Sequence, residues 1–272
     1  MGLFDRLFKK KAAQLTPEPE KVVEQSAPAQ DIKITVTTER RYEEEKPIGE
    51  LSHLDFGKPA GELGRFLNYC SYKVIGTDER GKRRMKFRTG VDAQQAIDKV
   101  AAEGFLPPYE AEALEYEPPT DRQLDYLKSL GVFIPEDITK DDASYMISRA
   151  IGEDSMEGPG TALLALAVGL KTEFSAFVGS TGLFDSIIAQ ARDRDRAALY
   201  AYGVRQSMRG GSFGNMLEDC DLVVFYAFAD LVLADPALMR SLSGRASEDF
   251  KKPNRGTAIY KAAVAHFTGG GL

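Results

Sequence analysis

The clearest hydrophobic pattern in the chain lies in residues 119–151 and predicts a helical hairpin. Its first helix is indicated by leucines that recur at every third position: Leu124, Leu127 and Leu130. Thr120 and Gln123 have the spacing of a capping box, in which each side chain binds the backbone of the other residue at the start of a helix. Gly131 is placed to end that helix, because glycine adopts a positive φ without steric cost.

The second helix of the hairpin shows the same kinds of signal. Thr139 is its predicted N-cap, and Asp142 stands in the reciprocal position of a second capping box. Its apolar residues follow at i, i+3, i+4 and i+7: Ala143, Met146, Ile147 and Ala150. This spacing places all four on one face of a helix, so we expect that face to be buried.

Shorter patterns in residues 31–118 predict a small sheet covered by one helix. Strands are expected where apolar and polar residues alternate, at 31–41, 69–77, 83–91 and 109–116, the first of them as an edge strand. Asp92 is the predicted N-cap of a helix that ends before Gly104. The core-facing residues of this helix are expected to be Ala93, Ala96, Ile97, Val100 and Ala101. From residue 69 onward the predicted order is therefore ββαβ.

The remaining segments complete the predicted organisation. Residues 1–30 are rich in Pro, Glu, Gln and Ala and are expected to form a flexible arm. A polar, glycine-rich stretch at 152–160 separates the hairpin from residues 161–272, whose pattern is helical almost throughout. No internal repeat is evident. The predicted fold class is α+β: a small ββαβ domain at 31–118, the helical hairpin at 119–151, and an all-α bundle domain.

Composition and charge narrow the classes of function. The net charge is −6, so a polyanion site must be a local patch rather than the whole surface. The two Cys and two His residues lie too far apart in sequence for the usual spacings of zinc ligands, and we expect neither a metal nor a cofactor. No apolar run reaches the ~20 residues that span a bilayer, and no signal peptide is recognised, so we expect a cytoplasmic protein. The longest apolar run, Leu222–Ala234, is typical of a buried bundle helix.

The main candidate site is a basic strand. Six cationic residues are gathered in this stretch: Arg80, Lys82, Arg83, Arg84, Lys86 and Arg88. On a strand, Arg84, Lys86 and Arg88 share one face, where they are spaced to contact successive phosphates of DNA or RNA. The intervening Met85 and Phe87 are expected to face the core. The alternative is an ordinary solvated hairpin, whose charges protect a sheet edge from aggregation.

Aromatic residues near the basic strand could add to this site. Tyr69 and Tyr72 are candidate stacking surfaces for unpaired bases. Together with the cations, they would make the predicted interface suited to single-stranded nucleic acid.

A weaker candidate for phosphate binding lies near the C-terminal end. Lys251, Lys252 and Arg255 precede a helix that is predicted to start near Thr257, and the N-terminus of a helix attracts anions. The spacing of a P-loop is absent. The alternative, which we favour, is a capped final helix with a basic lead-in.

Residues 1–11 carry a short amphipathic pattern. The apolar residues that share one helical face are Leu3, Phe4, Leu7 and Phe8. Three lysines follow them. This surface is small, so it predicts at most weak membrane contact. The alternative is a segment that docks on a partner, on its own domain, or on nothing.

The helical hairpin also resembles a module found in other proteins. The shared pattern is T-x-x-Q-x-x-Y-L-x-x-L-G followed by K-x-x-A-S-x-x-I, carried here by Thr120, Gln123, Tyr126, Leu127, Leu130, Gly131, Lys140, Ala143, Ser144 and Ile147. It is similar to modules attached to phage-linked single-strand annealing proteins, to exonucleases, and to uncharacterised proteins of gut Firmicutes and mobile elements. The resemblance covers residues 69–151 and depends on cap and core positions. It implies association with DNA or RNA rather than catalysis.

These observations favour a non-enzymatic, nucleic-acid-associated protein of a bacterial mobile element or phage. The alternative is a protein-interaction or scaffold protein that binds a partner through its C-terminal helical domain. An enzyme that acts on a phosphorylated substrate near Arg255 is a weaker alternative, since no catalytic residues are recognised.

Overall fold

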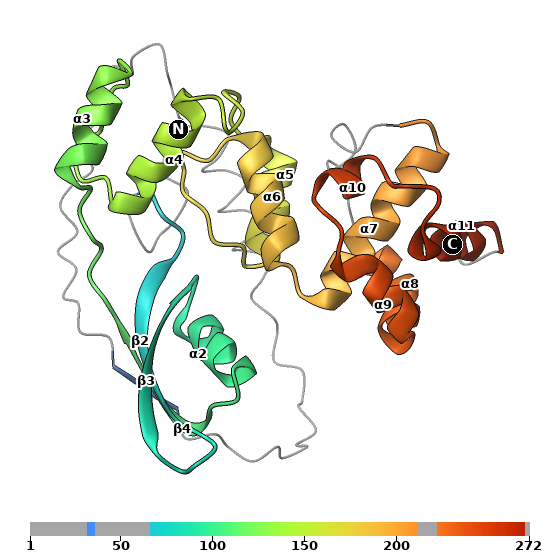
Figure 1. The fold of residues 1–272 in the computed structure, drawn as a ribbon, viewed down its shortest axis with the longest axis horizontal. Helices are drawn as coiled ribbons and strands as arrows, with labels where there is room; N and C mark the ends of the chain where they lie inside the picture. The colour runs from blue at the N-terminus through green and yellow to red at the C-terminus, as the bar shows by residue number, and fades with distance from the viewer. Residues whose placement is uncertain (1–31, 36–65, 212–221, 270–272) are drawn as a thin grey trace, which may run out of the picture.

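The computed structural model describes residues 32–35, 66–211 and 222–269 (Figure 1). The small sheet lies at the lower left of Figure 1 and the C-terminal helices at the right, with the helices of residues 161–190 between them. The helices of residues 121–150 lie above the sheet (Figure 1). The predicted arm at 1–30, with the amphipathic pattern at 1–11, lies outside the described residues.

The sheet has four strands in the order β1-β4-β2-β3. β2 (Cys70–Thr77) is antiparallel to both β3 (Arg83–Gly90) and β4 (Leu106–Ala113). β1 (Ile32–Thr35) is parallel to β4 and forms one edge. The predicted strands are confirmed, although β4 begins at residue 106 instead of 109. Of the predicted strand at 31–41, residues 32–35 are described and form β1, and the other positions lie outside the described residues.

One face of the sheet is covered by α2 (Ala93–Ala102). The helix starts where Asp92 accepts a hydrogen bond from the Gln95 amide at 2.8 Å, as the sequence predicts. The residues of the core between helix and sheet include Ala96, Ile97, Val100, Val74 and Ala111. Ala101 was expected in this core but is exposed, because it lies at the margin of the apolar stripe.

The predicted helical hairpin is confirmed and consists of α3 (Asp121–Ser129) and α4 (Lys140–Ala150); we call it hairpin 1. Both predicted capping boxes are formed, and Gly131 has a φ of 70° at the end of α3. The core of hairpin 1 includes Leu127, Val132, Ile138, Ala143 and Met146. The hairpin therefore follows from its own caps and apolar stripes.

A second hairpin, hairpin 2, repeats this geometry 40 positions later. It consists of α5 (Thr161–Gly169) and α6 (Ser180–Gln190), whose lengths of 9 and 11 residues equal those of α3 and α4. Lys171 has a positive φ of 53° at the position that corresponds to Gly131. The expectation that the chain has no internal repeat is therefore wrong at the level of structure.

The repeat escaped sequence analysis because the two hairpins are capped differently. Gly179 precedes α6 where Thr139 precedes α4, and glycine has no side chain with which to cap a helix. The cap comes instead from Asp154, whose carboxylate accepts hydrogen bonds from the amides of Gly179 at 2.6 Å and Gly182 at 2.7 Å. The same backbone path is thus specified by different residues.

The C-terminal helices surround α7 (Asp193–Met208), in which residues 197–204 are all buried. Its neighbours are η2 (Leu222–Phe225), α8 (Tyr226–Ala234), α10 (Glu248–Lys251) and α11 (Ala258–Thr268), while α9 (Pro236–Ser243) packs on α8 and α11. No single helix among the described residues could cross a bilayer by length and composition. The stretch Leu222–Ala234 meets that test only together with α9, to which it is bent by 109°.

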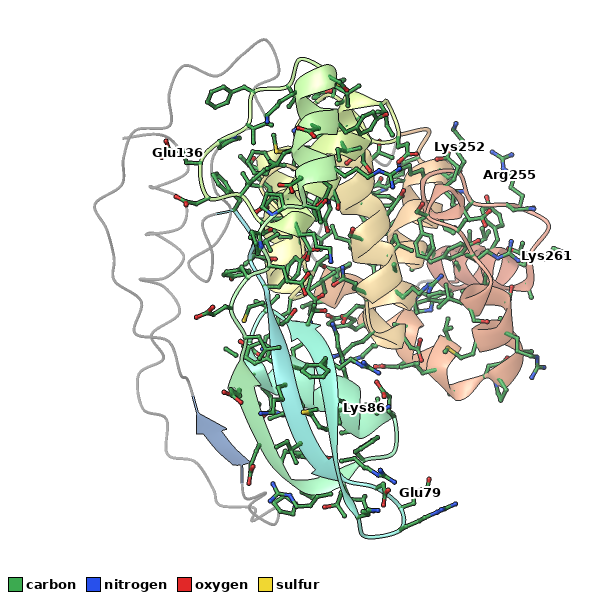
Figure 2. All side chains as sticks on the ribbon, turned by 60° about the vertical axis from the view of Figure 1, so that its left-hand side comes forward. Glu79, Lys86, Glu136, Lys252, Arg255 and Lys261 are labelled. Carbon is green, nitrogen blue, oxygen red and sulfur yellow. The ribbon has the colours of Figure 1, made fainter. Side chains whose placement is uncertain are left out.

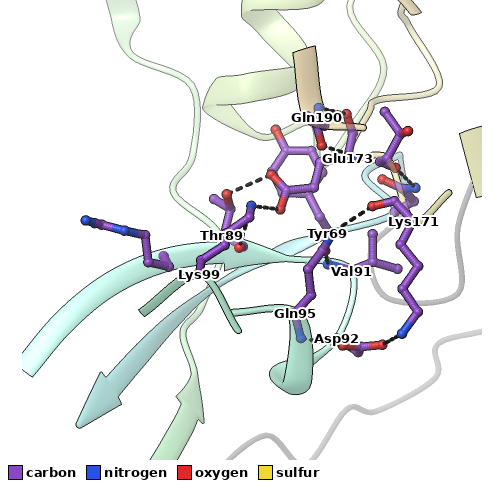
Figure 3. Close-up of polar contacts among 12 residues, drawn as sticks. Tyr69, Thr89, Val91, Asp92, Gln95, Lys99, Lys171, Glu173 and Gln190 are labelled. Carbon is purple, nitrogen blue, oxygen red and sulfur yellow. Dashed lines mark hydrogen bonds and ion pairs between the residues drawn. The ribbon is translucent and has the colours of Figure 1, made fainter. Parts of the chain in front are cut away.

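The linker of hairpin 2 joins the sheet to the helices through a polar cluster (Figure 3). Glu173 of this linker accepts hydrogen bonds from Lys99 at 2.5 Å and from Thr89 at 2.7 Å, and its main chain pairs with the Gln190 side chain. Lys171 forms an ion pair with Asp92 at 2.7 Å. These contacts hold the sheet at a fixed position on hairpin 2.

A buried carboxylate joins the two hairpins. Asp142 of hairpin 1 accepts a hydrogen bond from Ser175 of hairpin 2 at 2.5 Å, and it also accepts from the backbone and side chain of Thr139. Burial raises the pKa of Asp142 above its ordinary value of 3.8, and the hydrogen bonds only partly oppose this effect.

The first stability prediction concerns the core of hairpin 1. Leu127→Ala removes a fully buried side chain and should lower the free energy of unfolding by about 2–5 kcal/mol. Lys128→Ala is the matched control: its exposed side chain approaches only Asp125, at 3.7 Å, and should change stability by less than about 1 kcal/mol. Chemical denaturation measures both, and equal effects would show that the stripe of α3 does not carry the packing energy.

The second prediction uses the raised pKa of Asp142. Because the folded state binds this proton more tightly than the unfolded state, the contribution to stability is complete at low pH and is lost as the pH rises through the raised pKa. Asp142→Asn keeps the shape and an acceptor for Thr139 but cannot ionise. The wild type should therefore lose stability relative to this variant as pH increases, by about 1.4 kcal/mol for each unit by which the pKa is raised. Denaturation across a pH series would contradict this if the difference stayed constant.

Candidate functional site

The β2–β3 hairpin brings the six predicted cationic residues together around a rigid turn. Asp78 accepts hydrogen bonds from the amides of Arg80 at 3.0 Å and Lys82 at 2.9 Å, while Gly81 supplies a φ of 72°. The Lys82 amide is the largest cause that lowers the pKa of Asp78. Arg80 and Lys82 form no ion pair with any described residue, so the tip of the hairpin carries two available positive charges.

Arg84, Lys86 and Arg88 share one face of β3, as predicted, but their charges are largely compensated. Arg84 pairs with Asp78 at 3.2 Å, and both Lys86 and Arg88 pair with Glu103 at the end of α2, at 3.5 and 2.6 Å. The hydrogen bond from Arg88 is the largest cause that lowers the pKa of Glu103. This face is the one on which α2 packs, so it is not a free row of cations.

The expectation that Met85 and Phe87 face the core is wrong. They are 50% and 53% exposed, because α2 covers the opposite face of the sheet and no described element covers theirs. The cations on the α2 side of the sheet remain solvated because they lie at the margin of the contact between the helix and the sheet. Lys86, for example, places its ammonium 5.3 Å from the centre of the Phe105 ring. Alternation along β3 separated the two faces correctly but did not show which of them meets the helix.

Tyr69 and Tyr72 are not available as stacking surfaces. Both are buried, Tyr69 donates a hydrogen bond to Asp141 at 2.8 Å, and burial raises the pKa of both phenols. Phe87 is instead the exposed aromatic residue next to the cations. Arg83 lies on this open face, where it pairs with Glu110 at 2.8 Å.

The weaker phosphate candidates are Lys251, Lys252 and Arg255, of which Lys252 and Arg255 lie far from Lys86, at the opposite side of the C-terminal helices (Figure 2). Lys251 places its ammonium 4.7 Å from the centre of the Phe184 ring, and Lys252 pairs with Glu248 at 3.3 Å. These two cations therefore have separate partners and do not converge on one position.

The start of α11 fits the alternative that we favoured for this segment. Thr257 is its N-cap and accepts a hydrogen bond from the Tyr260 amide at 3.3 Å. The observed structure is a capped helix with a basic lead-in.

A further surface was missed by sequence analysis. The stretch Leu222–Ala234 is buried on one side only, and its other side carries apolar residues in solvent: Val223, Val224, Ala227, Leu231 and Ala234. We call these five residues the α8 face. Val223 is 68% exposed and Leu231 54%. A continuous apolar run resembles a fully buried helix, so the sequence could not reveal the exposed side.

The α8 face is bordered by one fixed ion pair. Arg194 of α7 binds Asp230 through two hydrogen bonds of 2.8 Å, and this contact is the largest cause that lowers the pKa of Asp230. The guanidinium also lies over the Tyr226 ring, 4.3 Å from its centre. The pair links α7 to α8 at the border of the exposed side.

The described residues contain no group of three or more His, Cys, Asp or Glu that could hold a metal ion. A shallow pocket on hairpin 1 is lined by Arg122, Gln123, Asp125, Tyr126, Ser129 and Ile147. Comparison of the chain with protein-family models, with curated proteins and with solved structures finds no match.

Proposed function

We propose that this chain is a protein-interaction protein whose C-terminal helices bind a partner through the α8 face. The observation that carries this proposal is the exposure of Val223 and Leu231 on one side of the stretch Leu222–Ala234, whose other side is buried. Exposed apolar side chains that gather on one face are typical of protein-binding surfaces, because contact with a partner removes them from water.

The position of the face supports the same function. α8 packs on α7 through its buried residues Phe228, Ala229 and Val232, so the apolar side is presented on a packed support. A rigid surface loses little conformational entropy on binding, which favours affinity.

Association with DNA or RNA is the second candidate, and a separate observation favours it. Arg80 and Lys82 stand without ion-pair partners among the described side chains, and Phe87 is exposed on the same hairpin. Cations that hold phosphates beside an aromatic ring that stacks on a base are the usual elements of a single-strand interface. The resemblance of hairpin 1 to modules of phage-linked proteins also points to this candidate and to an origin in a phage or mobile element.

The α8 face is tested by affinity purification from the native host, with nuclease treatment. Leu231→Glu and Val223→Glu place a charge in the centre of the face and should abolish recovery of a protein partner. Lys261→Glu, an exposed position on α11, is the matched control and should recover the partner as the wild type does. Thermal unfolding confirms that all variants are folded. Recovery of the same proteins by wild type and face variants would contradict the proposal.

The nucleic-acid candidate is tested by the salt dependence of oligonucleotide binding, measured by fluorescence anisotropy. Arg80→Gln combined with Lys82→Gln should reduce the slope of log K against log salt by about 1.4, the value for two phosphate contacts with a single strand. Arg84→Gln combined with Arg88→Gln should reduce it less, because these charges are already paired with Asp78 and Glu103. Equal slopes for both double variants would contradict this candidate.

A further inference from the structure

The linker of hairpin 2 is occupied by an extended segment of the same chain. Residues 66–68, which precede β2, run antiparallel to residues 174–176 and form a β-bridge with them. Asn68 donates its amide to the Phe174 carbonyl at 3.2 Å, and the Phe66 carbonyl accepts from the Ala176 amide at 2.7 Å. Two backbone hydrogen bonds therefore fix the register of the segment.

The Asn68 side chain adds two further hydrogen bonds to this linker. Its oxygen accepts from the Phe174 amide at 2.8 Å, and its nitrogen donates to the Thr172 carbonyl at 2.8 Å. A single asparagine side chain thus binds both the Phe174 amide and the Thr172 carbonyl of the linker. Such recognition favours an amide side chain, because its oxygen accepts and its nitrogen donates at the same time from two adjacent atoms.

The apolar residues of the segment are buried between the two hairpins. Phe66 is 4% exposed and its ring centre lies 4.7 Å from that of Phe177 in hairpin 2, while Phe66 also belongs to the core of hairpin 1. Leu67 is 2% exposed. The docking of a short extended segment on a hairpin linker is therefore a contact that this fold makes.

The linker of hairpin 1 has the same backbone path. Val132 donates to the Leu127 carbonyl at 3.1 Å as Thr172 donates to the Ala167 carbonyl at 2.9 Å. Further along each linker, the Lys140 amide donates to the Glu117 carbonyl at 2.9 Å in hairpin 1, and the Ser180 amide donates to the Glu157 carbonyl at 3.0 Å in hairpin 2. One difference is the φ of 60° at Asp137, which lies beyond the residues that correspond to the bridge.

The groups that bind residues 66–68 in hairpin 2 have counterparts in hairpin 1. They are the carbonyl of Val132, the amide and carbonyl of Ile134, and the amide of Glu136. None of these four groups forms a hydrogen bond with any residue that the structure describes. Pro135 occupies the position of Ser175, whose amide takes no part in the bridge, so the proline removes no donor that docking requires.

We propose that the linker of hairpin 1 is a docking site for an extended peptide of a partner protein, bound as residues 66–68 are bound by hairpin 2. The peptide places an asparagine opposite Ile134, two positions after an apolar residue that lies opposite Glu136. Glu136 is exposed at the outer edge of hairpin 1 (Figure 2), so a basic residue before the apolar one complements its charge. In the sequence, Arg65 precedes Phe66.

The probe is a labelled peptide that copies residues 63–71 with Ser in place of Cys70, titrated into the full chain. Saturable binding is expected in fluorescence anisotropy, together with slower hydrogen exchange of the Glu136 amide. The version of the peptide with Asn68→Ala should bind more weakly, because two hydrogen bonds are lost. Absence of binding by the first peptide, or equal binding by both, would overturn the proposal.

Two variants of the protein separate the backbone contact from the charge. Glu136→Gln keeps the amide N–H and should weaken binding by up to about fivefold, the range of an exposed ion pair. Glu136→Pro removes the N–H at a turn position that tolerates proline and should weaken binding by about a further tenfold. Unchanged binding by Glu136→Pro, or no added protection of the Glu136 amide in the wild type, would show that the peptide binds elsewhere. Leu231→Glu should leave peptide binding unchanged, so this test is independent of the α8 face.

Discussion

The arrangement of the sheet and the two hairpins depends on the short bridge between residues 66–68 and the linker of hairpin 2. The contacts of Asn68 join positions that are 104 and 106 residues apart in the sequence. Phe66 enters the core of hairpin 1 from the same segment, and β2 begins at Cys70. One extended segment thus positions the sheet and both hairpins. Its buried hydrogen bonds define a single arrangement, which apolar packing alone would not do.

The two hairpins show that one backbone path can be specified by different chemistry. In hairpin 1 the information is local, because Thr139 and Asp142 cap the helix from within its own first turn. In hairpin 2 the cap is supplied from outside by Asp154, and the positive φ is adopted by Lys171 instead of glycine. Hairpin 2 therefore depends on its neighbours, which agrees with its place between the sheet and the C-terminal helices.

Local signals in the sequence predicted the elements well, and tertiary relations account for the failures. The caps at Thr120 and Asp92 depend on residues only three positions apart in the sequence, and both caps are confirmed. Met85 and Phe87 were misplaced, since strand alternation defines two faces but not the one that α2 covers. The exposed side of α8 and the repeat of the hairpin likewise depend on which surfaces meet, and no short-range pattern contains that information.

The external cap of α6 has a consequence for how this chain can be divided. A Cβ atom at Gly179 or Gly182 would collide with the Asp154 carboxylate, so the carboxylate and the two glycines form one interdependent unit. The polar stretch at 152–160 has the composition of a cleavable connection, yet it carries the residue that starts α6. A fragment that begins at Thr161 would keep every helix of hairpin 2 and lose the hydrogen bonds that begin one of them. Sequence composition thus marks this stretch as a border, whereas hydrogen bonding assigns it to the domain that follows.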